Sequence, residues 1–273
     1  MTIASRLNDK ISRSPNQFRD CYVPVFKVTC DGTPYHAGTA FGIELNSTRY
    51  MVTAAHVLER DEDNPCDSAD DLFVSVDGEL TQIERFERQV FRSGSQGLPP
   101  NSLLDLVLIL PTDIDLGRVF PRVFTMKDVH RPPLRSQLYV AACGFPSTKN
   151  GLKSSSTILS QMPVGYFGRV SDSGKCRKAG FDSKSHFAFD LLLKKTYTSR
   201  LKEVKAPKPH GISGGPVFVV HDFDRPKRFM KPKLRGVIIW MAPKQQCFVC
   251  VDLFAVLSAT HSVVSQRIKP NDG

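Results

Sequence analysis

The chain has 273 residues, of which 41% are hydrophobic and 23% charged, and its formal net charge is +10. This length excludes a disulfide-stapled miniprotein and allows one large domain or two small ones. The composition is that of a soluble globular protein, and no apolar run approaches the roughly 18 residues of a membrane helix, so we expect no membrane partner.

The beginning of the chain lacks the apolar core of a secretory signal peptide, and residues 4–14 predict a short helix. The seven cysteines are irregularly spaced and make a poor disulfide framework. Cys247 and Cys250 lie in an apolar run, so we interpret them as buried thiols of a strand rather than as zinc ligands. Together these features predict a cytoplasmic protein with reduced cysteines.

Twelve short runs rich in Val, Ile, Phe and Tyr, separated by Gly, Pro, Asn and Asp clusters, predict strands. The first six cover residues 21–30, 37–45, 49–55, 71–77, 79–87 and 105–111. The second six cover residues 137–145, 160–170, 186–193, 214–220, 234–241 and 246–253. Strands at this spacing indicate an all-β protein built as antiparallel barrels or sandwiches.

The segment 125–137 contains a Pro pair and is the best candidate for a boundary between two halves. We therefore predict an N-terminal extension over residues 1–20, a first barrel over 21–125 and a second barrel over 126–273. Helical spacing of apolar residues over 252–268 predicts that the second barrel ends in a C-terminal helix.

Positive charge gathers in two loop-like segments, residues 194–208 and 225–235. We interpret them as solvated hairpin loops, because no nucleic-acid-binding signature accompanies them; a basic nucleic-acid-binding protein remains the alternative. The acidic segment 60–71 lacks the spaced carboxylates of a calcium loop and predicts a surface loop. We expect no metal and no cofactor.

Three segments carry residue types suited to nucleophilic catalysis. An apolar strand ends in His56, a carboxylate opens the apolar run that follows Asp105, and Ser213 lies within the glycine-rich stretch 211–216. Serine is a weak nucleophile until a base takes its proton, and a buried carboxylate needs a partner such as an imidazole N–H. Glycines allow backbone N–H groups to converge on one point, as an oxyanion hole requires.

In this chain order, the segments 53–56, 105–110 and 211–216 resemble the motifs of the chymotrypsin/trypsin-like serine peptidases. Segments 38–43, 143–146 and 234–241 extend the resemblance over nearly the whole chain. It implies two six-stranded antiparallel Greek-key β-barrels with the active site between them. It further implies a serine endopeptidase acting through an acyl-enzyme on protein or peptide substrates, with the triad Ser213, His56 and Asp105.

The resemblance also implies the remaining site residues. The backbone N–H groups of Gly211 and Ser213 would form the oxyanion hole. The substrate would contact a further set of residues, namely His210, Ile239, Trp240 and Met241. No acidic residue stands at the base of the specificity pocket, so we expect a small or apolar P1 residue rather than Arg or Lys. His210 could instead recognise an acidic or amide P1 side chain.

The sequence departs from the secreted peptidases in two ways. Ile212 stands where zymogen-activated members have an Asp that pairs with a newly cut N-terminus, and Val57 replaces the cysteine after the histidine. The chain therefore resembles an intracellular, disulfide-free branch more than digestive trypsins. Without a zymogen device, two forms of restraint stay open: control by a protein partner or nucleic acid, within a stress or phage-defence pathway, or a narrow substrate specificity. A catalytically silent, trypsin-like interaction module is the alternative function.

Overall fold

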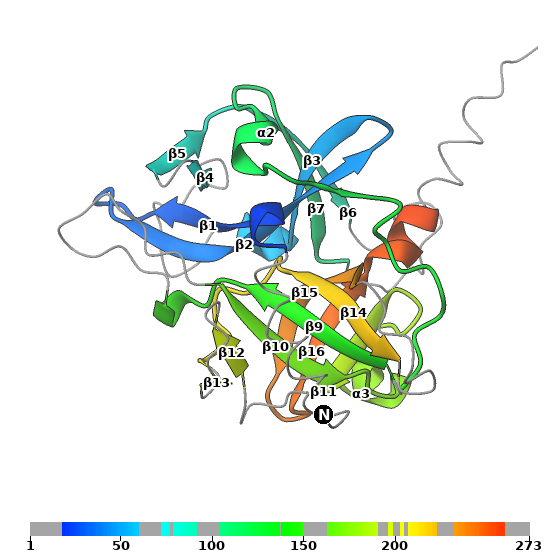
Figure 1. Cartoon of the computed structure of the whole chain (residues 1–273). Helices are drawn as coiled ribbons and strands as arrows, with labels where there is room; N and C mark the ends of the chain where they lie inside the picture. Colours follow the sequence, from blue (N-terminus) through cyan, green and yellow to red (C-terminus); the bar gives the residue numbers. More distant parts are fainter. Residues whose placement is uncertain are drawn as a thin grey trace, which may run out of the picture.

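The structure is a computed structural model, and it describes residues 18–59, 72–76, 79–91, 104–136, 138–149, 163–190, 196–198, 203–204, 207–222 and 232–259. Nearly all of this is organised by two curled antiparallel sheets, drawn one above the other in Figure 1. The predicted all-β architecture with two barrel-like halves is confirmed.

The first sheet has eight strands in the order β5-β4-β1-β2-β3-β7-β6, with β8 pairing alongside β2. Their bounds are β1 (Tyr22–Val28), β2 (Pro34–Leu45), β3 (Thr48–Thr53), β4 (Leu72–Val76), β5 (Glu79–Ile83), β6 (Phe86–Phe91), β7 (Leu106–Pro111) and β8 (Phe124–Thr125). The β-branched and aromatic residues of these strands suit a pleated sheet that buries one face.

The second sheet also has eight strands, in the order β11-β16-β15-β14-β9-β10-β12-β13. Their bounds are β9 (Leu138–Gly144), β10 (Val164–Arg169), β11 (His186–Asp190), β12 (Thr196–Thr198), β13 (Glu203–Val204), β14 (Pro216–Asp222), β15 (Lys233–Ala242) and β16 (Cys247–Asp252). An isolated bridge between Val170 and Phe189 brings the end of β10 back to β11, so the sheet curls toward closure.

Each sheet holds eight strands rather than the predicted six, for two reasons. The predicted strand 79–87 is divided into β5 and β6 by a two-residue break, where the Asp113 carboxylate accepts the backbone N–H groups of Glu84 (2.7 Å) and Arg85 (3.3 Å). The other added strands, β8, β12 and β13, are two or three residues long. Such short strands carry too few residues to show a hydrophobic period.

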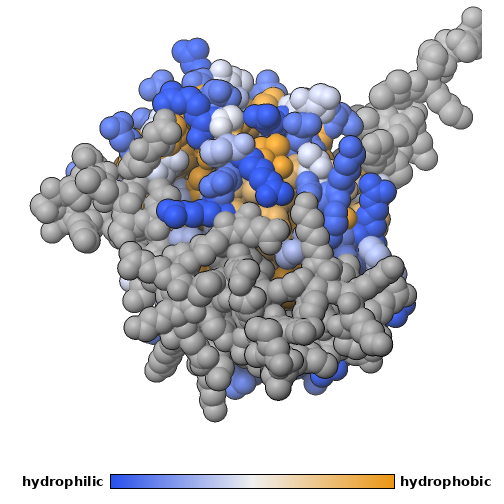
Figure 2. Space-filling model, in the orientation of Figure 1, coloured by the Kyte–Doolittle hydropathy of each residue, from blue (hydrophilic) through white to orange (hydrophobic). Residues whose placement is uncertain are grey.

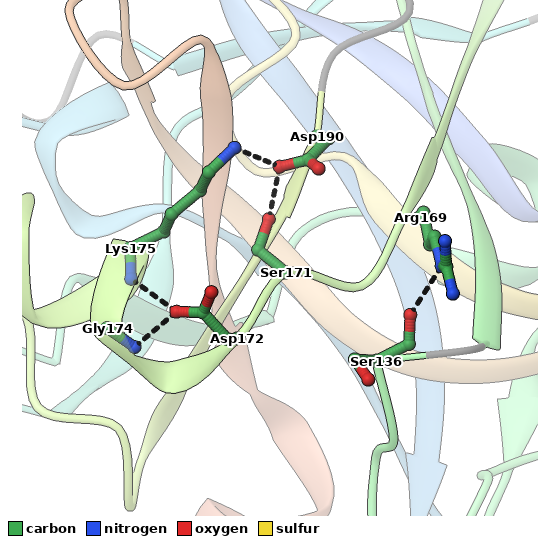
Figure 3. Close-up of polar contacts among 7 residues, drawn as sticks. All are labelled: Ser136, Arg169, Ser171, Asp172, Gly174, Lys175 and Asp190. Atoms are coloured by element: carbon green, nitrogen blue, oxygen red, sulfur yellow. Dashed lines mark hydrogen bonds and ion pairs between the residues drawn. The ribbon is translucent and has the colours of Figure 1, made fainter.

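Helices also occur inside the chain, where none was predicted: α2 (Leu116–Val119) and α3 (Ser173–Lys178). The Asp172 side chain caps α3 by accepting the N–H groups of Gly174 (2.8 Å) and Lys175 (3.1 Å). Lys175 Nζ also pairs with Asp190 Oδ1 at 2.6 Å, which ties α3 to β11 (Figure 3). The sequence predicts helices only over residues 4–14 and 252–268 and therefore misses both of these helices.

The two predicted terminal helices fare differently. The N-terminal one, at residues 4–14, lies outside the described residues. The C-terminal helix is confirmed over residues 253–259, and the rest of its predicted range lies outside the described part.

Within the described ranges, no helix combines the length and the apolar character needed to cross a bilayer. On the face drawn in Figure 2, the described residues are mainly hydrophilic, with apolar ones visible between them.

Aromatic side chains connect the two sheets. The Phe18 ring stacks on that of Phe218 of β14, with centroids 4.4 Å apart. Phe124 of β8 lies 5.6 Å from Phe18 and 5.5 Å from Phe218, so the three rings make one cluster. All three side chains are almost fully buried. The segment just before β1 therefore contributes to the contact between the halves.

The cysteines correct one expectation. Cys247 and Cys250 are buried free thiols in β16, as predicted. Cys30 is disulfide-bonded, however, so the chain is not the disulfide-free protein that we expected. The spacing of the cysteines could not show this bond, because pairing depends on which loops meet in space.

Candidate active site

His56 and Asp105 come together because two neighbouring strands bring them side by side. Thr53, the last residue of β3, is the register partner of Val107 of β7. His56 follows in the short helix η2 (Ala55–Val57), and Asp105 directly precedes β7. Asp105 Oδ1 accepts the backbone N–H of His56 at 2.8 Å, and Oδ2 contacts the ring Nδ1. The carboxylate therefore holds the Nδ1 side of the imidazole and leaves Nε2 for a substrate or nucleophile.

Ser213 lies on a loop that is fixed by backbone hydrogen bonds. The N–H of Gly214 donates to the Ile238 carbonyl (2.7 Å), and the N–H of Ile238 donates to the Gly215 carbonyl (3.0 Å). These bonds attach the loop to β15, next to the cleft. The Ser213 carbonyl accepts the N–H of Thr39 at 2.8 Å, so β2 of the first sheet also holds the loop.

One open cleft of about 430 Å³ joins the two halves of the site. It is lined by residues of both sheets and of the Ser213 loop, namely Ala37, His56, Pro209, His210, Gly211, Ile212, Ser213, Ile238, Ile239, Trp240, Met241, Pro243 and Phe248. Ser213 and His56 thus face the same space. In the described structure no hydrogen bond joins their side chains, an arrangement common in unliganded sites.

The predicted oxyanion residues are placed to act together. Gly211 has a φ of +86°, in the left-handed region that glycine adopts without penalty. In the loop around it, Ile212, Gly214 and Gly215 donate their N–H groups to backbone carbonyls. Among the described residues, the N–H groups of Gly211 and Ser213 have no protein acceptor. These two donors, two residues apart, are therefore available to a ligand.

All four predicted substrate-binding residues line the cleft. Ile239 is buried, whereas Trp240 is 55% exposed. A register shift in the pairing of β15 with β16 falls between Ile238 and Trp240, where the strand is locally irregular. Such a bulge re-aims side chains. The sequence missed Pro243 and Ala37, which carry no signal of their own and reach the cleft only through the fold.

None of the described residues that line the cleft is Asp, Glu, Lys or Arg. This composition suits an uncharged substrate side chain, because a buried charge without a partner costs several kcal/mol.

A cysteine nucleophile is disfavoured in this region. Cys143 is the nearest candidate, because its backbone carbonyl lies against Gly215 of the Ser213 loop. Burial raises the pKa of the Cys143 thiol to about 12, which keeps it protonated. Only a thiolate is an effective nucleophile. Within the described ranges, no three His, Cys, Asp or Glu side chains come together as a metal site.

Solved structures with the same fold include a serine protease and an inactivated protease paralogue. One is a scabies mite inactivated protease paralogue, which superposes with a TM-score of 0.53 at 12% identity, over 93% of this chain and 98% of that one. The other is neuropsin, a serine protease from mouse brain, with a TM-score of 0.53 at 12% identity, over 93% and 96% of the two chains. No family model and no curated protein sequence matches the chain.

The chain therefore has the chymotrypsin-like double β-barrel fold. One of the two similar structures is a serine protease and the other is described as inactivated, so the fold is compatible with a hydrolase and with an inactive relative. The residues of the site must distinguish these functions.

Proposed function

We propose that this protein is a serine endopeptidase with Ser213 as nucleophile, His56 as general base and Asp105 as the residue that orients the histidine. The observation that carries the proposal is the contact of the Asp105 carboxylate with both the backbone and the ring of His56, at the mouth of the cleft that Ser213 lines. A histidine held in this way presents Nε2 as the base.

The reaction follows from these positions. His56 Nε2 takes the proton of the Ser213 hydroxyl as its oxygen attacks the scissile carbonyl, and Asp105 stabilises the imidazolium that forms. The N–H groups of Gly211 and Ser213 receive the oxyanion. His56 then protonates the leaving amine, and water, deprotonated by the same ring, releases the acyl group and regenerates the serine.

A fluorophosphonate probe tests the proposal, because it phosphonylates a serine that an adjacent base has activated. We expect labelling at Ser213, cleavage of casein or a peptide library, and loss of both in Ser213→Ala with unchanged thermal unfolding. If the wild-type protein is neither labelled nor active, both when purified and in a lysate of its source cells, the serine peptidase proposal is refuted and the alternative function, a catalytically silent interaction module, is favoured.

The proposed substrate carries an apolar P1 side chain. Ile239, Met241 and Phe248 line the cleft, and within the described part of the chain no acidic side chain lines it that could pair with Arg or Lys. His210 also lines the cleft, and its exposed ring is available to an amide or acidic side chain. A peptide library with varied P1 residues distinguishes these choices, and strong preference for P1 Arg would contradict the proposal.

Control by a protein partner, within a stress or phage-defence pathway, remains part of the proposal. It rests on Ile212, which cannot form the ion pair of a zymogen-activated enzyme. Cytoplasmic location is also a proposal, and the Cys30 disulfide weighs against it, because disulfides are rare in reducing compartments. Comparing the activity of the purified protein with that in a lysate of its source cells tests for an activator.

A further inference from the structure

The orientation of a single peptide bond decides whether the Gly211 N–H can act as an oxyanion donor. The Ile212 N–H donates to the Pro209 carbonyl at 3.4 Å, and Gly211 has a φ of +86°. These are the features of a type II turn with glycine at its third position. In a type I turn over the same four residues, the central peptide is turned over and φ at that position is about −90°. The Gly211 N–H would then point the opposite way.

Groups outside the loop hold the observed orientation. The carbonyl of His210, which belongs to the central peptide, accepts the N–H of Ser147 at 2.8 Å. Because N–H and C=O of a trans peptide point in opposite directions, this bond fixes the direction of the Gly211 N–H. A Cβ on Gly211 would lie 2.4 Å from His36 Nδ1 and 2.6 Å from Ser147 Oγ, so the loop is also enclosed by side chains.

Thr39 holds the next peptide of the same loop. Its hydroxyl donates to the Gly211 carbonyl (3.0 Å) and accepts the N–H of Phe145 (3.1 Å). Its backbone N–H donates to the Ser213 carbonyl (2.8 Å), and its own carbonyl accepts the Thr53 hydroxyl (2.8 Å). Thr39 is fully buried and lies in β2. One residue of the first sheet therefore forms hydrogen bonds with the carbonyls of both proposed oxyanion residues, which belong to the second half.

We propose that Thr39 is a positioning residue that keeps the oxyanion hole formed in the unliganded protein. The inference rests on the proposed function for its effect on catalysis, but the hydrogen bonds themselves do not depend on it. A hydroxyl is required because it must donate to one backbone group and accept from another at once. Valine has the same shape and can do neither, whereas serine can do both.

The test compares Thr39→Val with Thr39→Ser and with Thr125→Val. Thr125 is the matched control, because its hydroxyl also donates to one group (Asp128 Oδ2, 3.0 Å) and accepts from another (the N–H of Lys127, 3.3 Å), but it lies outside the cleft and bonds no residue of the Gly211 loop. We expect Thr39→Val to lower kcat about ten- to a hundredfold with KM changed less than threefold, since only the transition state needs the oxyanion donors. Thr39→Ser should restore kcat to within threefold of wild type, and Thr125→Val should leave kcat unchanged.

A peptide aldehyde gives a second readout in the active protein. Its carbonyl adds the Ser213 oxygen, the serine proton passes to the product oxygen, and that oxygen occupies the hole. Affinity for the aldehyde should fall in Thr39→Val by about the same factor as kcat, while affinity for the corresponding alcohol should not. Equal kcat and equal aldehyde affinity in wild type and Thr39→Val would overturn the role of Thr39.

Hydrogen exchange tests the inference even if the protein proves inactive. We expect the hydrogen-bonded backbone amides of the loop, those of Ile212, Gly214 and Gly215, to exchange faster in Thr39→Val than in wild type or Thr39→Ser. Unchanged exchange in this segment would refute the positioning role. Faster exchange in a wild-type-like fold that no fluorophosphonate labels would instead refute the proposed function alone.

Discussion

Replacing Asp105 with Asn changes the site by one atom. Both carboxylate oxygens of Asp105 accept from His56, one from its backbone N–H at 2.8 Å and the other from its ring. Asparagine offers one acceptor oxygen and one NH₂ donor. If the oxygen keeps the backbone N–H, the NH₂ group faces Nδ1. The ring must then accept at Nδ1 and carry its proton on Nε2, where it cannot take the proton of Ser213.

The expected loss follows from this tautomer. With the base in the wrong form, kcat should fall about 10⁴-fold, or about 5.5 kcal/mol in the activation free energy. Turning the amide over does not rescue the site, because the NH₂ group would then meet the backbone N–H of His56. KM should change little, since Asp105 does not line the cleft.

Steady-state hydrolysis of a peptide substrate measures the effect, and ¹⁵N spectra of the His56 ring identify the tautomer. Asp113→Asn is the matched control, because that carboxylate also accepts backbone N–H groups in the first sheet but lies outside the cleft. An Asp105→Asn protein that is folded and within tenfold of wild-type kcat would refute the role assigned to Asp105.

Three further outcomes follow from the structure. Gly211→Ala should lower kcat about 10²- to 10³-fold, because the added Cβ would clash with His36 and force the turn to change type. That change removes one oxyanion donor, and an unchanged kcat would contradict this reasoning. Burial holds the pKa of His36 at about 4, below its usual 6.5, so the stabilisation present above pH 6.5 is lost as pH falls toward 4. We therefore expect that, between pH 7 and pH 4, the free energy of unfolding measured in urea falls by about 3 kcal/mol more in wild type than in His36→Phe. The same pH dependence of that free energy in both proteins would rule this out. Arg235→Met should lower the free energy of unfolding in the same assay by about 3–5 kcal/mol, because it leaves the buried Asp252 carboxylate without the ion-pair partner that lies 2.6 Å away. Adding Asp252→Asn should recover most of that loss, and no recovery would contradict this explanation.

Much of the fold could be predicted because runs rich in Val, Ile, Phe and Tyr are separated by clusters of turn residues. The exceptions have physical causes. β12 and β13 are too short to show a hydrophobic period, and the break between β5 and β6 depends on Asp113, which is distant in sequence. Helix α3 did leave a signal, since Asp172 is a good N-cap residue, but a six-residue helix has too few apolar positions to reveal a period.

The proposed site residues could be selected in advance because their chemistry requires unusual neighbours, such as glycines around a serine or a carboxylate before an apolar strand. Thr39 could not, because a threonine in a strand is ordinary and only the meeting of two sheets gives its hydroxyl two backbone partners. The Cys30 disulfide was missed for a similar reason, since it depends on contacts between distant segments.

Trp240 is the only tryptophan of the chain, it is 55% exposed, and it lines the cleft. Its fluorescence therefore comes from one known place, without a background from other indoles. A peptide that covers the ring would shift the emission to shorter wavelengths as water leaves it. In Ser213→Ala, which should bind peptides without cutting them, the protein would report its own substrate affinities without any attached dye.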